Sequence, residues 1–175
     1  MSYQLQQFSL ESVHLTLQNW QKAVQDDDLF ALEYQDLFKW TESHIQYEDK
    51  HLESYAYGIF TKDSPNTAAH AIVDIIQRPH GKKQTKLLKL VVSPQFADDT
   101  DLSNLNTLVD LMLAAVLGTI EISGRNSSST IKICGRTNSM LSVLRKLNET
   151  ITNSSAFPKS ITTKIAGRWL EISLT

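Results

Sequence analysis

KLLKLVVSPQFADDTDLSNLNTLVDLMLAAVL, residues 86–117, is the stretch that decides the fold of this chain. An apolar strand over 86–93 runs to Pro94, a short polar loop follows, and a strongly apolar helix begins at Leu102. Since the strand is apolar on both faces, we expect it near the centre of a sheet. Many α/β folds bind phosphate at such a strand-to-helix step, because the first N–H groups of the helix have no partner within it.

The loop between that strand and that helix has an unusual composition. Residues 95–102 contain no glycine, which would let the backbone approach a phosphate closely, and no basic residue. They contain Asp98, Asp99 and Asp101 instead, and these carboxylates would repel a polyanion. The stretch therefore predicts the fold clearly, while its loop opposes the phosphate binding that the fold suggests.

The composition is that of an ordinary soluble globular protein. The chain has 175 residues, 41% hydrophobic content, 21% charged content and a formal net charge of −2. We expect a single domain over 1–175, with an N-terminal helical part over 1–50 and a sheet core over 54–175. The near-neutral charge provides no bulk attraction to nucleic acid or to an anionic membrane, so neither is an expected partner.

Cysteine content and the N-terminus indicate a cytoplasmic protein. Cys134 is the one cysteine, so an intrachain disulfide is excluded. The first residues, MSYQLQQFSLESVH, lack the basic and apolar regions of a signal peptide. The longest apolar run, Leu111–Leu117, is too short to span a bilayer.

Hydrophobic periodicity predicts four helices and six strands. The expected helices cover 10–25, 28–46, 102–124 and 138–149, and the expected strands cover 54–62, 68–78, 86–93, 130–135 and two segments flanking Ala166-Gly167. The first three strands form an antiparallel meander, and the crossover from the third to the fourth is parallel and right-handed. The fold class is therefore α+β, with a central mixed sheet and helices on both faces.

This order of elements, with LKLVVSP at its centre, resembles the GNAT superfamily of acyl-CoA-dependent N-acyltransferases over roughly residues 54–175. In that family the central strand ends in a Val-x-Pro pattern, which Val92-Ser93-Pro94 matches. The resemblance implies that the backbone of Val91, Val92 and Ser93 holds the pantetheine arm of the cofactor, and that Asn138 opens the helix after the cofactor cleft. Acetyl-CoA or another acyl-CoA would be the cofactor, and a small-molecule or peptide amine would be the substrate.

Two further positions decide how the resemblance is interpreted. Seven residues after Asn138, where the family commonly has a tyrosine that protonates the leaving thiolate, this chain has Arg145. Lys146-Leu147 matches the family pattern, but Asn148-Glu149 replaces Gly-Phe. Three functions remain open: a divergent acyltransferase, a non-catalytic module that binds a protein partner or its own copy, and a sensor of a small ligand.

A group of basic residues around the turn between the second and third expected strands could supply the positive charge that residues 95–102 lack. It consists of Arg78, His80, Lys82, Lys83 and Lys86. A solvated turn explains the same residues, because short basic clusters are common on surfaces.

Asp74 is the candidate catalytic base. His70 and Asp74 are expected on one strand, four residues apart and on one face, where an imidazole and an orienting carboxylate could act together. A half-exposed polar face explains the same pattern.

The remaining candidates have weaker patterns. Cys134 shares a face with Lys132 and Arg136, which suits a reactive thiol, but no histidine stands nearby in sequence, and a structural cysteine is the alternative. No histidine shows a metal-ligand spacing, so no metal is expected. Trp169 lies in the last strand, where edge pairing would build a homodimer.

Overall fold

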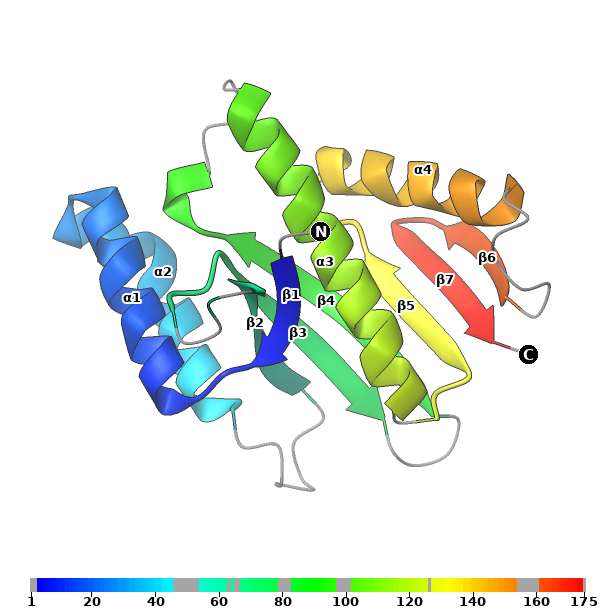
Figure 1. Cartoon of the computed structure of the whole chain (residues 1–175), viewed down its shortest axis with the longest axis horizontal. Coiled ribbons are helices and arrows are strands. Elements are labelled where there is room, and N and C mark those ends of the chain that lie inside the picture. The colour runs from blue at the N-terminus through cyan, green and yellow to red at the C-terminus, as the bar shows by residue number, and fades with distance from the viewer. Residues whose placement is uncertain are drawn as a thin grey trace. The chain divides into compact units, whose positions relative to one another are not determined.

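The computed structural model describes residues 3–45, 54–62, 64, 67–78, 83–96, 102–125, 127–153 and 161–174. Within them the strands are β1 Tyr3–Gln7, β2 Ser54–Thr61, β3 Ala71–Arg78, β4 Gln84–Val92, β5 Thr130–Cys134, β6 Ile161–Ala166 and β7 Trp169–Leu174. The helices are α1 Leu10–Val24, α2 Asp27–Ser43, α3 Leu102–Arg125 and α4 Asn138–Asn153, with a short 3₁₀ turn, η1, over Pro94–Phe96 (Figure 1). The strands form a mixed sheet in the order β1-β2-β3-β4-β5-β7-β6.

The chain divides into two compact units that share strands β3 and β4 and helix α3. The first unit contains residues 1–74 and 90–115, and the second contains 75–89 and 116–175. Each unit is described by itself below.

The predicted mixed sheet is confirmed. β4 lies at the centre of the strand order, and β4 pairs with β5 in parallel, Gln84–Leu87 against Thr130–Ile133. The hairpin of β6 and β7 is also confirmed, with Ala166 opposite Trp169. Gly167 begins its two-residue loop with a φ of +60°, which glycine adopts without strain.

Two expectations about the sheet are wrong. Strand β1 was not predicted, because Tyr3–Gln7 contains three glutamines and only two apolar side chains; it pairs antiparallel with β2 at the sheet edge. Trp169 does not lie at an edge, because β7 inserts between β5 and β6 and pairs with both. A dimer built by edge pairing of β7 is therefore excluded.

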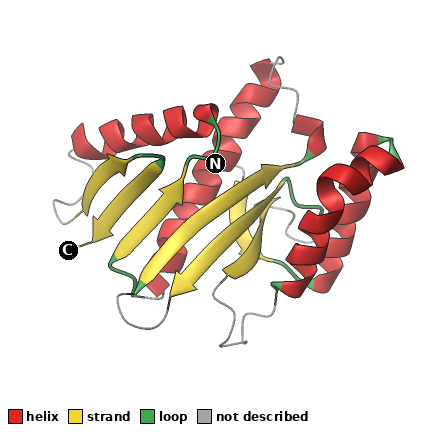
Figure 2. Ribbon diagram, turned by 180° about the vertical axis from the view of Figure 1, so that it is seen from behind, coloured by secondary structure: helices red, strands yellow, loops and turns green. Residues whose placement is uncertain are grey.

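Helices α1 and α2 build the core of the first unit, and they run side by side (Figure 2). Ser9 and Ser12 form a capping box that begins α1, and the Asp26 carboxylate accepts a hydrogen bond from Leu29 N at 2.9 Å to begin α2. The Trp20 ring is fully buried and packs edge-to-face against Phe38, at 5.5 Å between ring centroids. The predicted start of α1 is confirmed, whereas α2 begins at Asp27, one residue before the predicted 28.

In the second unit, α4 packs against β6 and β7. The side chains of Lys132, Glu171 and Lys164 lie in one row across β5, β7 and β6. Glu171 accepts hydrogen bonds from Lys132 and, at 3.1 Å, from Lys164. These bonds, that from Lys132 first, hold the pKa of the Glu171 carboxyl below its usual range. The ammonium group of Lys132, which the sequence had suggested as an activator of Cys134, is therefore paired with the Glu171 carboxylate.

Helix α3 corrects the expectation about membrane-spanning length. The uninterrupted apolar run is short, but Asn106–Arg125 is long and apolar enough to cross a membrane by length and composition alone. A core helix meets the same criterion, and Leu111 and Ala115 of this helix are fully buried.

Gly58 in β2 provides a test of the core packing. A Cβ there would lie 2.4 Å from Phe60 Cε2 and 2.8 Å from Phe8 Cζ, and both rings are buried. Gly58→Ala should therefore lower the free energy of unfolding by about 1–3 kcal/mol, because rigid buried rings must move. Urea unfolding monitored by circular dichroism measures this change.

Gly124→Ala is the matched control. Gly124 lies inside α3 and a Cβ there meets nothing within 4 Å, so alanine should stabilise the helix by about 0.5–1 kcal/mol. If Gly58→Ala were as stable as the parent protein, the packing described around Phe8 and Phe60 would be wrong.

Candidate functional site

The end of β4 has a backbone edge that strand pairing does not use. The ladder with β5 ends at Leu87, whereas β4 continues to Val92. At Leu88 the carbonyl accepts a hydrogen bond from Arg136 Nε at 3.0 Å. Among the described residues, no β4 residue beyond Leu87 pairs with β5.

The direction of the backbone groups follows from strand geometry. Successive residues of a strand direct their N–H and C=O groups to opposite sides. Ser93 N donates to His70 O at 2.8 Å, on the β3 side, and Leu88 O is bonded on the opposite side. Leu90 and Val92 therefore present their backbone groups on the side where the ladder with β5 has ended. We name this edge, Leu90–Val92, the open edge of β4.

The residue pair before β3 is fixed by hydrogen bonds from three directions. From α1, Thr16 Oγ1 accepts from Ala69 N and Trp20 Nε1 donates to Ala69 O, both at 2.9 Å. From β2, Ile59 O accepts from His70 N at 2.8 Å, and Ser93 N completes the set by donating to His70 O. The backbone at His70 therefore has little freedom to move relative to the end of β4.

The imidazole of His70 lies among groups from three elements. Its Nε2 lies 3.0 Å from Thr61 Oγ1 of β2, and its Nδ1 lies 3.4 Å from Gln95 Nε2 of η1. The Tyr3 ring of β1 packs edge-on at 5.2 Å between centroids, and the Phe96 ring lies at 5.7 Å. We name these five residues the His70 cluster.

Burial lowers the pKa of the His70 imidazole below its ordinary value of 6.5, so the ring is neutral at pH 7. Because the folded-state pKa is below the unfolded one, protonation favours the unfolded chain. The contribution of this ring to the free energy of unfolding is fully present above the pKa of the unfolded chain. It is lost as the pH falls through the lower pKa of the folded protein.

The predicted base and its partner do not form a pair. His70 precedes β3, which begins at Ala71, and four residues of extended chain place it roughly 13 Å from Asp74. Asp74 Oδ1 instead accepts a hydrogen bond from Ser54 Oγ at 2.5 Å. The expected His70–Asp74 dyad is therefore wrong; Asp74 as a base on its own stays a prediction.

The predicted cofactor residues fall in both units. Val91 and Val92 are half-buried and Ser93 is fully buried, at the end of β4. Asn138 is exposed and begins α4, but it is not the cap: Thr137 Oγ1 accepts from Met140 N at 3.1 Å. Their cofactor roles stay predictions.

In the second unit, Arg168 forms hydrogen bonds with the backbone of Gly135 and Arg136, just before α4. Its Nε donates to Gly135 O at 2.8 Å, its Nη2 donates to Arg136 O, and Gly135 N donates back to Arg168 O at 2.8 Å.

Arg145, at the position of the family's tyrosine, is exposed on α4. Cys134 is half-buried on β5, and it stays a candidate by position alone.

Some predicted residues lie outside the described part of the chain. These are the acidic loop residues Asp98, Asp99 and Asp101, and His80 and Lys82 of the basic group. Across the described ranges, no three His, Cys, Asp or Glu side chains are placed to hold a metal ion.

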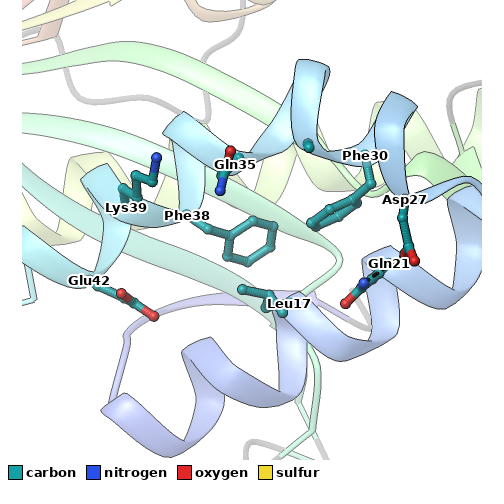
Figure 3. Close-up of a pocket in the computed structure, with 9 residues that line it drawn as sticks. Leu17, Gln21, Asp27, Phe30, Gln35, Phe38, Lys39 and Glu42 are labelled. Atoms are coloured by element: carbon teal, nitrogen blue, oxygen red, sulfur yellow. Dashed lines mark hydrogen bonds between the residues drawn. The ribbon is translucent and has the colours of Figure 1, made fainter.

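A cavity of about 340 Å³ lies between α1 and α2 (Figure 3). Leu17, Phe30 and Phe38 form its apolar floor, and charged groups such as Asp27 and Glu42 stand at its rim. The floor rings are almost fully buried by the core, and Asp27 Oδ1 accepts a bond from Gln21 Nε2 at 2.8 Å. At its rim, Glu42 also lies 3.6 Å from His14 Nε2 and Lys39 lies 3.7 Å from Asp36, so most of the charged groups around this cavity already have partners.

Sequence reasoning missed Thr61, Gln95 and Tyr3. Thr61 and Gln95 meet His70 only because β2 and η1 converge on it, which no spacing reveals. Tyr3 belongs to the strand that was not predicted. His70 was the one member of the cluster that sequence reasoning had singled out.

Comparisons with known proteins support the fold. The sequence matches no protein-family model and no curated protein. Among solved structures, a probable acetyltransferase from Staphylococcus epidermidis has a TM-score of 0.55 and 12% identity over 99% of both chains. An acetyltransferase from Streptococcus agalactiae has a TM-score of 0.42 and 12% identity, over 100% of this chain and 99% of that one. The NatC complex bound to Gag peptide and CoA has a TM-score of 0.49 and 10% identity over 100% of both chains.

The similarity to the Staphylococcus epidermidis protein shows that this chain shares its fold, a mixed α/β fold with a central mixed sheet. The predicted resemblance is thereby confirmed at the level of the fold. Identity of 12% shows the fold alone, so the chemistry must be argued from this chain's own residues.

Two buried hydroxyl groups in different surroundings provide a paired test. In the described part of the chain, the fully buried Ser93 Oγ has no hydrogen-bond partner, whereas Thr85 Oγ1 and Ser128 Oγ are bonded at 2.9 Å. Ser93→Ala should leave stability unchanged or raise it by up to about 1 kcal/mol, because an unpaired polar atom is removed.

Thr85→Val should cost about 1–3 kcal/mol, because it leaves the buried Ser128 hydroxyl without its partner. Urea unfolding of both variants measures the difference. A loss of stability in Ser93→Ala as large as that in Thr85→Val would show that the Ser93 hydroxyl has a partner.

Proposed function

We propose that this chain is a divergent acyl-CoA-dependent N-acyltransferase, which transfers an acyl group from acetyl-CoA or another acyl-CoA to an amine of a small molecule or peptide. The open edge of β4 carries the proposal. It presents the backbone groups of Leu90 and Val92 in extended geometry, and within the described residues the ladder with β5 ends before them. The two amide groups of a pantetheine arm can bond to such an edge as an added strand does.

The residues present fit the pantetheine arm. Val91 packs against the core of the first unit, and the half-buried side chain of Val92 provides apolar surface on the other face of the strand. The Ser93 N–H already donates to His70 O, so it is not free to bind the ligand. The backbone groups proposed to bind the pantetheine arm are therefore those of Leu90 and Val92, in place of the predicted Val91–Ser93. When bound, acyl-CoA would supply the activated thioester carbonyl.

The acidic composition of residues 95–102 is the reason for calling the protein divergent. Phosphate recognition through a glycine-rich loop is not supported by this sequence. The alternative is a non-catalytic module with the same fold, which binds a protein partner, its own copy or a small ligand. The experiment below separates the two.

The proposal predicts acetyl-CoA binding that depends on a backbone N–H of the open edge. Isothermal titration of the protein with acetyl-CoA should give micromolar affinity. Val92→Pro removes the Val92 N–H at an edge position, where proline is tolerated, and should weaken binding at least about tenfold.

Val92→Ala is the matched control, since it trims the side chain but keeps the N–H; its affinity should stay within about threefold of the parent's. An absence of binding at millimolar acetyl-CoA would rule out the acyltransferase and favour the non-catalytic module. Equal affinity in the parent and Val92→Pro would place the ligand elsewhere.

A further inference from the structure

The two compact units carry opposite charges, which the net charge of the whole chain conceals. The second unit, residues 75–89 and 116–175, contains 13 of the 17 Lys and Arg residues but only 3 of the 19 Asp and Glu residues, a formal charge of +10. The first unit has a formal charge of −12. Salt screens charges beyond about 8 Å at physiological ionic strength, so a surface attracts partners through its own charges. The net charge of −2 therefore does not exclude a polyanionic partner for the second unit.

The three carboxylates of the second unit already have basic partners within it. Glu121 lies 3.8 Å from Arg125 Nη2, and Glu149 lies 3.5 Å from Lys146 Nζ. Glu171 accepts hydrogen bonds from two lysines. The excess positive charge of this unit therefore cannot be neutralised from within the unit.

Strands β5, β7 and β6 direct one face away from α4. Thr163 Oγ1 of β6 lies 3.2 Å from Thr152 Oγ1 of α4, so Thr163 faces the helix and the next residue, Lys164, faces away from it. Lys164 lies opposite Glu171 of β7, which lies opposite Lys132 of β5. These three side chains therefore share the face from which Figure 2 is viewed.

Two more side chains extend this row. Lys86 of β4 lies beside Lys132 in the parallel ladder, so it belongs to the same face. Trp169 of β7 precedes Glu171 by two residues and is half-buried on that face. We name Lys86, Lys132, Lys164, Glu171 and Trp169 the basic face of the second unit.

The cations of the basic face are more accessible than its carboxylate. The side chains of Lys164 and Lys132 are 70% and 29% exposed, whereas that of Glu171, between them, is 16% exposed. A ligand that approaches the face therefore meets ammonium groups first.

The spread of the lysines favours an extended polyanion. Lys86, Lys132 and Lys164 lie on β4, β5 and β6, the first and last separated by three strand spacings, or about 14 Å. One small anion cannot contact all three. In a single-stranded nucleic acid, by contrast, successive phosphates can bind the lysines, and an unpaired base can stack on an aromatic ring such as Trp169.

A membrane surface fits this unit less well. A helix that lies on a membrane needs an apolar face as well as cations. Within the described part of the second unit, Leu117 is the one large hydrophobic side chain that is well exposed. The chemistry of the unit is therefore charge without apolar surface, as in nucleic-acid interfaces.

We propose that the basic face binds a single-stranded nucleic acid, with Lys86, Lys132 and Lys164 on its phosphates and Trp169 stacked on a base. This inference goes beyond the proposed acyltransferase function and does not rest on it.

Fluorescence anisotropy of a labelled oligouridylate RNA of about 20 nucleotides, titrated with the full chain, tests the proposal. Between about 50 and 200 mM salt, the logarithm of the affinity should fall with a slope of about −2, as expected for three neutralised phosphates. The double variant Lys86→Gln, Lys164→Gln should weaken binding at least about tenfold and reduce the slope by about 1.4. Lys39→Gln, an exposed lysine of the acidic first unit, is the matched control and should leave the affinity unchanged.

Two further variants distinguish binding from a general loss of folding. Glu171→Gln removes the carboxylate of the face and should raise the affinity about twofold to fivefold, a gain that misfolding cannot produce. Trp169→Ala should weaken binding at least about fivefold, and Trp169→Phe, which keeps an aromatic ring, should restore it. Circular dichroism of each variant confirms that the fold is retained.

The contrary outcomes are equally specific. No binding of the RNA at about 100 μM protein in low salt would overturn the proposal. An equal loss of affinity in Lys39→Gln and in the double lysine variant would overturn the assignment to the basic face. Binding to vesicles that contain phosphatidylserine, without binding to the RNA, would assign the charge to a membrane instead. Displacement of the RNA by micromolar acetyl-CoA would assign it to the cofactor and leave the acyltransferase standing.

Discussion

The peptide groups of Ala69 and His70 are the constraint on which the first unit depends. Hydrogen bonds from Thr16 and Trp20 of α1, from β2 and from Ser93 meet on these two residues. Ala69 is almost fully buried, so each unmade bond would cost about 1–3 kcal/mol. Helix α1, strand β2 and the end of β4 therefore cannot shift independently. The position of the His70 ring is therefore set by core packing, although His70 itself lies outside a strand, just before β3.

Much of the fold could be predicted because its signals are local. The apolar run at 86–93, the capping serine at Ser9 and the Ala166-Gly167 turn each specify their element through nearby residues. Strand β1 could not be predicted, since a glutamine-rich edge strand becomes a strand only by pairing with β2. The insertion of β7 between β5 and β6 is likewise a property of topology, and no pattern within Trp169–Leu174 encodes it.

The candidate site was less predictable, because its contacts join distant parts of the sequence. The Val-x-Pro pattern located the end of β4, but only the bonds of Ser93 and Leu88 show which backbone groups face the open side. His70 was noticed, but alternation paired it with Asp74, whereas the folded chain pairs it with Thr61 and Gln95. Residues four apart in extended chain share a face but lie roughly 13 Å apart, too far for a direct hydrogen bond, and overlooking this separation produced the wrong dyad.

The central claim is that this GNAT-like fold keeps a usable open edge at the end of β4. Amide hydrogen exchange by NMR, with and without millimolar acetyl-CoA, tests this claim most directly. The account predicts selective slowing of exchange at the amides of Leu90 and Val92, with the amide of Ser93, already bonded to His70 O, protected in both states. Unchanged exchange at Leu90 and Val92 under saturating acetyl-CoA would contradict it.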